Sequence, residues 1–293
     1  MTPLSRHGLI AVDIGNSRIK FGYFAPVLNN APDSTAVSNT LPEPASCLTL
    51  SAATDDFAEL AAWVETLAPA GWLLASVHRQ ATERLQNWLH SVSIQSAKTG
   101  ALAAAHQYQV LNYQQLPLKV RVKRPEEVGI DRLLGAVAAN RLRHTSEPAI
   151  VISVGSAITV NWVDATGAFC GGAILPGIAM SARAMHDFTD LLPLIPMQEL
   201  ADPPAVLGIS TDEAMRSGLY WGAVGAIREL IERLSATYCT ASNQQPRIFL
   251  TGGAASAVAE LLGRSTVHVP HLMLAGLAIS ASAVGNSNAT EQQ

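Results

Sequence analysis

A chain of 293 residues exceeds the size at which one hydrophobic core usually stops growing, so we expect two domains. Because 48% of the residues are hydrophobic and only 14% are charged, the composition excludes an intrinsically disordered chain. The formal net charge of −4 offers no broad basic surface, and no run of about 20 apolar residues predicts a membrane span, so we expect neither a nucleic-acid nor a membrane partner.

The cysteines and the N-terminal residues indicate the cellular location of the protein. Cys47, Cys170 and Cys239 are far apart in the sequence, with no CxxC pair and no adjacent histidine that would suggest a zinc site. We expect three reduced, buried thiols. Asp13 interrupts the apolar stretch near the N-terminus, which is unlike a secretory leader. The sequence therefore predicts a cytoplasmic protein.

The first part of the chain predicts a mixed sheet covered by helices. An apolar run, the turn residues Gly15-Asn16-Ser17 and an alternating stretch are typical of a β-hairpin. The segments after residue 56 alternate between helical and strand-like spacing. The predicted elements are strands 9–13 and 18–24, a weak strand near 48–50, a helix over 57–67, a strand over 72–77 and a helix over 80–92.

The second part begins with a basic segment, Lys119–Arg124. Such a segment is typical either of a solvated strand or of a local positive charge that helps to bind an anionic ligand. Further along, Ser210-Thr211-Asp212-Glu213 has the spacing of a capping box and predicts a helix start. The predicted elements are a helix over 127–143, strands over 150–153, 158–163 and 169–175, a helix from 211 to about 234, a strand over 247–250, a helix over 254–262, a strand near 267 and a helix from about 272.

An internal repeat carries the first functional signal. Residues 12–17 and 152–157 share one pattern, in which a buried strand leads through a polar and an apolar residue to glycine and a second strand. Glycine allows close backbone approach, and the surrounding amides and hydroxyls can donate to phosphate oxygens. The turn Thr251-Gly252-Gly253 lies between a strand and a helix, where a nucleotide also fits. These turns predict a protein that holds a nucleotide phosphate between two similar α/β halves.

The motifs resemble those of the type III pantothenate kinases of the actin-like sugar-kinase superfamily, from about residue 9 to residue 284. The first phosphate motif reads Asp13-Ile14-Gly15-Asn16-Ser17 and continues to Lys20 and Gly22, as in the branch that includes Bvg accessory factor. A G-x-D-R motif stands at 129–132, a G-G-x-I-x-P-G motif at 171–177 and a T-G-G turn at 251–253. The resemblance implies ATP-dependent phosphorylation of pantothenate, the first step towards coenzyme A, by a homodimer that uses Mg²⁺ and a monovalent cation, K⁺ or NH₄⁺.

The resemblance also implies a fold and a set of binding residues. We expect two ribonuclease-H-like domains of the actin-like ATPase type, over 7–125 and 126–285, each with a mixed sheet flanked by helices, and a disordered tail over 286–293. The residues implied for ATP are Asp13, Ile14, Gly15, Asn16, Ser17, Arg18, Ile19, Lys20, Ser156, Gly252 and Gly253. The residues implied for pantothenate are Gly129, Ile130, Asp131, Arg132 and Thr211.

Several of these residues have a structural alternative. Asp13 fits a carboxylate that binds Mg²⁺ through water, or a turn cap. Asp131 matches the catalytic base of the family, but it would equally complement a helix macrodipole. Arg132 could hold the pantothenate carboxylate or sit in a structural ion pair. Lys20 could meet phosphate or lie exposed on a strand. Ser156 and Thr211 match ligand-binding threonines, or serve as caps.

The second phosphate motif departs from the family pattern. The family's usual D-x-G-T-A-x-T-x-D reads here from Ser153 to Asn161, so both carboxylates are replaced and the cation position falls on Ser153. A charge lost about 4 Å from a cation is worth on the order of 4 kcal/mol at an effective dielectric near 20. Two hypotheses follow: an active kinase with a relaxed cation requirement, or a catalytically weakened nucleotide-binding regulatory protein. Retention of Asp13, Asp131 and Arg132 favours the first.

Overall fold

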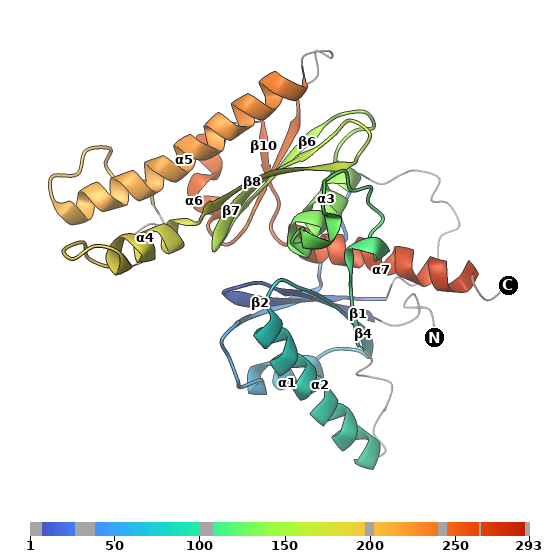
Figure 1. Cartoon of the computed structure of the whole chain (residues 1–293). Coiled ribbons are helices and arrows are strands. Elements are labelled where there is room, and N and C mark those ends of the chain that lie inside the picture. Colours follow the sequence, from blue (N-terminus) through green and yellow to red (C-terminus); the bar gives the residue numbers. More distant parts are fainter. Residues whose placement is uncertain are drawn as a thin grey trace. The chain divides into compact units, whose positions relative to one another are not determined.

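The computed structural model describes residues 8–26, 39–99, 108–196, 202–239, 245–263 and 265–290. The chain divides into two compact units (Figure 1). Unit 1 consists of Met1–Leu118, Lys123–Leu142 and Leu272–Gln293, and unit 2 consists of Lys119–Val122 and Arg143–His271. Unit 1 is therefore built from three separate stretches of sequence.

Unit 1 is built on a five-stranded mixed sheet of order β3-β2-β1-β4-β5. The β1–β2 and β2–β3 pairs are antiparallel, whereas β1–β4 and β4–β5 are parallel. The predicted hairpin and the weak strand near residue 48 are confirmed. The strands are β1 (Gly8–Ile14), β2 (Arg18–Phe24), β3 (Ser46–Ser51), β4 (Ala70–Ser76) and β5 (Tyr108–Val110).

Helices cover both faces of this sheet. On one face, Ile10, Val12 and Ile14 of β1 enter a core with Leu60 and Leu85, from α1 (Ala58–Glu65) and α2 (Arg79–Thr99). The opposite face packs against α3 (Ile130–Leu142) and α7 (Leu272–Thr290). Because side chains alternate along a strand, Asp13 belongs to this second face. Short 3₁₀ turns, η2 (Tyr113–Gln115) and η3 (Pro125–Glu127), precede α3, which begins three residues later than the sequence predicts.

Unit 2 repeats the topology of unit 1. Its sheet has the order β10-β9-β6-β7-β8, with antiparallel β6–β7 and β7–β8 pairs and parallel β6–β9 and β9–β10 pairs. The predicted pair of ribonuclease-H-like units is thereby confirmed. The strands are β6 (Ala149–Val154), β7 (Ala157–Val163), β8 (Phe169–Pro176), β9 (Arg247–Thr251) and β10 (Thr266–His268).

One face of the second sheet carries the core of unit 2. Ile152, Val154 and Val160 pack there with Tyr220 and Val258. The serine at the predicted capping box does cap its helix, since the amide of Glu213 donates to the Ser210 hydroxyl over 3.2 Å. The helical elements are α4 (Ile178–Asp187), α5 (Thr211–Tyr238), α6 (Ala255–Ala259) and the 3₁₀ turn η5 (Glu260–Leu262).

The division of the chain differs from the boundary expected at residue 125. Helices α3 and α7 follow that boundary in sequence, yet they belong to unit 1 because they pack on its sheet and on each other. At their contact, a Cβ on Gly276 would lie 2.3 Å from the Leu134 carbonyl oxygen, so only glycine permits this approach. Helix α7 reaches Thr290, so it includes most of the tail expected to be disordered, whose residues 291–293 lie outside the described residues.

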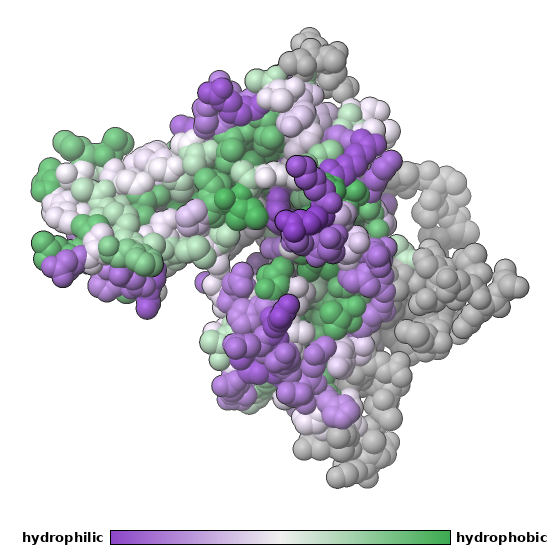
Figure 2. Space-filling model, in the orientation of Figure 1, coloured by the Kyte–Doolittle hydropathy of each residue, from purple (hydrophilic) through white to green (hydrophobic). Residues whose placement is uncertain are grey.

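Helix α4 and the described segments between α4 and α5 expose apolar side chains. Figure 2 shows hydrophobic residues over this part of the surface. A cavity of about 320 Å³ lies between the two helices and is lined by Ile178, Met185, Met215, Gly218 and Gly222 among others. Exposed apolar patches of this kind are typical of interaction surfaces. The exposed residues are Met180, Phe188, Leu191, Leu194, Val206, Leu207 and Ile209.

Two of the composition-based expectations can be compared with this fold. The cysteines are free thiols, but the expectation that all are buried is wrong, because Cys47 is exposed and Cys170 and Cys239 are half-buried. Cys47 lies on β3, an edge strand of the first sheet, where one side of the strand faces solvent. Among the described residues, none of the helices combines the length and the apolar character needed to cross a bilayer.

Candidate active site

The first hairpin places Asp13 at the carboxyl end of β1. Its partner across the β1–β2 pair is Lys20, so the two side chains share one face of the sheet. The turn is closed by a 3.0 Å hydrogen bond from the Gly15 amide to the Arg18 carbonyl oxygen. Asn16, Ser17 and Arg18 are exposed at the turn, where they could reach a ligand. In contrast, the Ile14 and Ile19 side chains lie in the core, which leaves only their backbone for ATP.

The first turn of α3 brings a second carboxylate to the same face of unit 1. Asp131 accepts a 2.9 Å hydrogen bond at Oδ1 from the amide of Arg132. Gly129 makes room for this conformation, because a Cβ there would lie 2.6 Å from Asp131 Oδ1. The G-x-D-R spacing is thus explained in part by the space that the aspartate carboxylate needs.

Burial and mutual charge shape the protonation of this cluster. Asp13 is only 8% exposed. Burial raises its pKa from 3.8 to about 6, with Lys20 opposing the shift and Asp131 adding to it. Burial also raises the pKa of Asp131, against the opposing effects of the Arg132 amide and guanidinium and of Lys20. Burial lowers the pKa of Arg132, while Asp131 acts against that shift. The structure therefore brings Asp13, Lys20, Asp131 and Arg132 together.

The Asp13 carboxylate fits the divalent ion that the resemblance implies. Carboxylate oxygens are the ligands that Mg²⁺ takes from proteins, usually one or two of them with several waters retained. Asp13 and Asp131 are both buried enough to be destabilised as uncompensated anions, which a cation would relieve. Asp13 is the residue that would hold Mg²⁺, as the sequence predicts.

We expect that Asp13→Asn stabilises the fold at neutral pH. The folded pKa of Asp13 lies above its usual value, so ionised Asp13 costs stability above pH 6, and this cost disappears as the pH falls towards 4. A shift of two units corresponds to about 3 kcal/mol. Urea unfolding at pH 7.5 and pH 4.5 measures the difference. Glu65→Gln, at an exposed position on α1, is the control and should change stability by less than about 0.5 kcal/mol at either pH. Equal destabilisation by Asp13→Asn at both pH values would contradict the expectation.

The glycine turns of unit 2 form a second candidate surface. The Gly177 amide donates a 2.9 Å hydrogen bond to the Ser156 carbonyl oxygen, and the Ala254 amide donates one of 3.1 Å to the Val154 carbonyl oxygen. Gly252 has φ +109°, and a Cβ there would lie 2.4 Å from the Val154 carbonyl oxygen. The hairpin carrying Ser156 and the turn carrying Gly252 and Gly253 therefore lie side by side, as a nucleotide-binding surface requires.

Gly177 is a residue whose role the sequence did not reveal. A Cβ at this position would lie 2.1 Å from the Gly155 carbonyl oxygen and 2.6 Å from that of Ser156. Gly177 thus permits the β8–α4 connection to pack closely against the β6–β7 hairpin. The G-G-x-I-x-P-G motif contains the signal, because a glycine after Pro176 at the end of a strand suggests a close approach.

The remaining predicted residues of unit 2 lie at strand and helix ends. Ser153 is half-buried on β6, opposite Thr159 on β7 and Thr251 on β9. Thr211 is exposed as the first residue of α5, and Ser210 provides the cap, which leaves the Thr211 hydroxyl without a capping role. In addition to the Ser210 cap, Glu213 Oε2 accepts a 2.9 Å hydrogen bond from the Ile209 amide.

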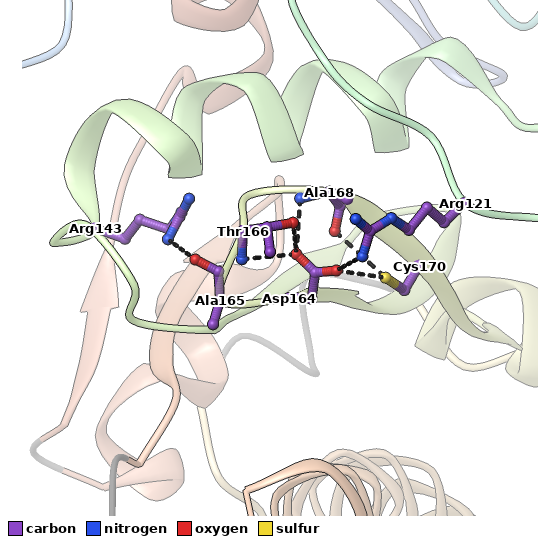
Figure 3. Close-up of polar contacts among 7 residues, drawn as sticks. All are labelled: Arg121, Arg143, Asp164, Ala165, Thr166, Ala168 and Cys170. Atoms are coloured by element: carbon purple, nitrogen blue, oxygen red, sulfur yellow. Dashed lines mark hydrogen bonds and ion pairs between the residues drawn. The ribbon is translucent and has the colours of Figure 1, made fainter. Parts of the chain in front are cut away.

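The basic segment before α3 has a structural role through Arg121. Figure 3 shows Arg121 and Asp164 pointing toward each other, joined by a 2.6 Å ion pair. Asp164 also accepts hydrogen bonds from Thr166 and from the amide of Ala168. Although burial raises the pKa of Asp164, these bonds and the charge of Arg121 hold it below its usual value. This ion pair holds Arg121 against the β7–β8 turn of unit 2. For Arg121 it therefore favours a place on a solvated strand over a role in binding an anionic ligand.

Comparison with known proteins identifies the family. A sequence profile of the type III pantothenate kinases matches residues 9–233. The chain belongs to the type III pantothenate kinase family. Two curated members of the family, from Dehalococcoides mccartyi and Paramagnetospirillum magneticum, are 40% and 41% identical to it over 162 and 145 residues. These matches cover 55% and 50% of this chain and 59% and 52% of those relatives. The chain thus spans about half the length of the curated relatives it matches.

A solved structure supports the fold. The chain is similar to a Baf family transcriptional activator from Campylobacter jejuni, with a TM-score of 0.54 and 17% identity. The similarity covers 96% of this chain and 99% of that one. This likeness bears on the fold alone, and the family assignment itself comes from the sequence match.

Proposed function

We propose that the protein transfers the γ-phosphoryl group of ATP to pantothenate, giving 4′-phosphopantothenate. The observation that carries this proposal is a pair of carboxylates, the buried Asp13 on β1 and the half-buried Asp131 on α3, next to Lys20 in a member of the pantothenate kinase family. Phosphoryl transfer depends mainly on positioning and on neutralised charge, with a base near the acceptor hydroxyl. The cluster offers groups for each of these tasks.

Asp131 suits the base. A general base works best when its pKa is close to the working pH, and burial raises the pKa of Asp131 in that direction. Its hydrogen bond from the Arg132 amide to Oδ1 orients the carboxylate, which would accept the proton of the pantothenate hydroxyl. The half-buried Arg132 guanidinium would bind the pantothenate carboxylate through paired hydrogen bonds. We assign the neighbouring Gly129 and Ile130 to the same substrate.

Asp13, Lys20 and the exposed turn residues of the first hairpin suit the phosphates. The turn amides and the hydroxyl of Ser17 can donate to phosphate oxygens, and Lys20 supplies a positive charge on the face that Asp13 shares. Mg²⁺, held by Asp13 together with ATP, would neutralise the charge of the transferring group. In unit 2 the turns at Ser156, Gly252 and Gly253 suit a nucleotide by themselves, because their backbone amides lie at the ends of strands.

The decisive experiment is a kinase assay. Purified protein with ATP, Mg²⁺ and pantothenate should form ADP and 4′-phosphopantothenate in equal amounts, detected by coupled ADP release and by mass spectrometry. Omitting pantothenate is the control, and ADP release should then fall to background. ADP formation that does not depend on pantothenate would refute the assignment of substrate.

The free thiols of the described residues are in keeping with the reducing cytoplasm, where we place the reaction.

We further propose a homodimer formed through α4 and α5. A second copy of the chain could cover the exposed apolar side chains of α4 and of the segments between α4 and α5 with the same surface of its own. The apolar cavity between the two helices would lie at this interface. Small residues lie along this face of α5, since Ala214, Gly218 and Gly222 all line the cavity. Small residues allow close approach of another helix.

We expect Gly222→Arg to give a monomer. A Cβ at Gly222 meets nothing within 4 Å, so the isolated subunit can accommodate the longer side chain, whereas a second helix against α5 cannot. Thr237→Arg, at an exposed position near the other end of α5, is the matched control and should leave the dimer intact. Sedimentation velocity measures the oligomeric state. A Gly222→Arg protein that still sediments as the parent does would place the interface on another surface.

A further inference from the structure

The repeated topology allows positions in the two units to be matched by strand register. In unit 1, Asp13 on β1 lies between Lys20 on β2 and Ala75 on β4. In unit 2, Ser153 on β6 lies between Thr159 on β7 and Thr251 on β9. Residues directly opposite each other in a sheet share a face. The row that is charged in unit 1 is therefore made of three hydroxyl side chains in unit 2.

A buried amide completes this neutral row. Asn161 follows Thr159 by two positions on β7, so it lies on the same face, and it is only 1% exposed. Its Nδ2 donates hydrogen bonds to the Val151 carbonyl oxygen over 3.3 Å and to Thr159 Oγ1 over 3.1 Å. Both of these oxygens therefore accept a hydrogen bond from the Asn161 amide group.

These residues do not fit the monovalent cation that the family resemblance implies. A cation site needs oxygen ligands turned toward the ion, and a carboxylate at Ser153 or Asn161 would supply both ligand and charge. Here the row Thr159, Ser153 and Thr251 carries no charge, and the amide group of Asn161 presents N–H donors to its neighbours.

We propose that unit 2 binds the nucleotide without a monovalent cation, through neutral hydroxyls and the backbone amides of its glycine turns. The proposal rests on the proposed function only in taking ATP as the nucleotide. The charged groups of the cluster in unit 1 remain available for Mg²⁺ and the phosphates. The loss of one cation site in unit 2 therefore leaves the role of these charged groups unchanged.

Nucleotide affinity in different salts tests the proposal separately from catalysis. The dissociation constant of a non-hydrolysable ATP analogue with Mg²⁺ is measured by calorimetry in potassium chloride, ammonium chloride and choline chloride at equal ionic strength. We expect the three values to agree within about twofold. Binding at least about fivefold tighter in potassium or ammonium would overturn the proposal. If the analogue binds equally in all three salts but no pantothenate is phosphorylated, the proposed function fails and this inference stands.

A variant designed to gain cation dependence tests whether this row of residues is the position at which a cation would bind. In Ser153→Asp the new carboxylate lies at a half-buried position, and we expect potassium to tighten nucleotide binding by at least about fivefold relative to choline. Ala165→Asp adds the same charge to an exposed turn of unit 2 and is the matched control, which should stay indifferent to the salt. Circular dichroism and melting temperature verify folding. A folded Ser153→Asp protein that remains indifferent to potassium would overturn the assignment to this position, and the salt comparison on the parent protein does not depend on either variant.

Discussion

Asp131→Asn should lower turnover at least about a hundredfold while leaving ATP binding nearly unchanged. General-base catalysis typically contributes about 10²–10⁴ in rate, and an amide cannot accept the hydroxyl proton. Asparagine keeps the shape of the side chain, and its oxygen can accept the hydrogen bond that the Arg132 amide gives to Asp131. Steady-state kinetics should therefore show a loss in kcat with little change in the KM for ATP.

Glu126→Gln separates this effect from a general loss of negative charge. Glu126 is an exposed carboxylate in η3, shortly before Asp131. Its replacement should leave kcat within about twofold of the parent value, as expected of a surface substitution. Near-normal turnover of Asp131→Asn would assign Asp131 to the helix macrodipole alone, the alternative that the sequence left open.

The second large effect concerns the backbone of unit 2. Gly252→Ala should lower the melting temperature by roughly 10 °C and weaken nucleotide binding at least about tenfold. The conformation at φ +109° is strained for any residue with a side chain, and the new Cβ would lie 2.4 Å from the Val154 carbonyl oxygen. The turn and the hairpin must then separate, and strain with overpacking together cost about 3 kcal/mol. Differential scanning calorimetry and calorimetric titration measure the two effects.

Gly155→Ala provides the contrast within the same pair of turns. A Cβ at Gly155 would lie 3.7 Å from the Ala157 carbonyl oxygen, which is an ordinary contact. The melting temperature without nucleotide should therefore change by less than about 3 °C. If both alanine variants melt like the parent, close packing of the two turns does not limit stability.

The sequence reveals local features of this protein well and distant ones poorly. The hairpins at Gly15 and Gly155 and the cap at Ser210 follow from turn chemistry and periodicity within a few residues, and the structure contains all three. The repeat could be recognised for the same reason. Each of these features depends on neighbours in the chain, which the sequence displays directly.

The environment of the charged cluster around Asp13 depends on contacts that no local pattern contains. The raised pKa of Asp13 arises from its burial beneath helices from later in the chain, and the sequence alone left its role as a turn cap open. The return of α7 to unit 1 was missed because an apolar helix packs equally well on either sheet as far as its composition shows. Gly177 acquires its role only through the carbonyl groups of Gly155 and Ser156.

Because unit 1 is built from three separate stretches of sequence, it cannot be completed during synthesis until the last of them has been made. Its sheet is translated early, but α7, which packs on β1, β2 and β4, leaves the ribosome only after the whole of unit 2. Domains generally fold as units during synthesis, with N-terminal ones first. Here unit 2, although later in sequence, can complete its core before unit 1 does. A ribosome-bound intermediate would thus contain a complete unit 2, whereas the sheet around Asp13 would be covered by α1, α2 and α3 and would still lack α7.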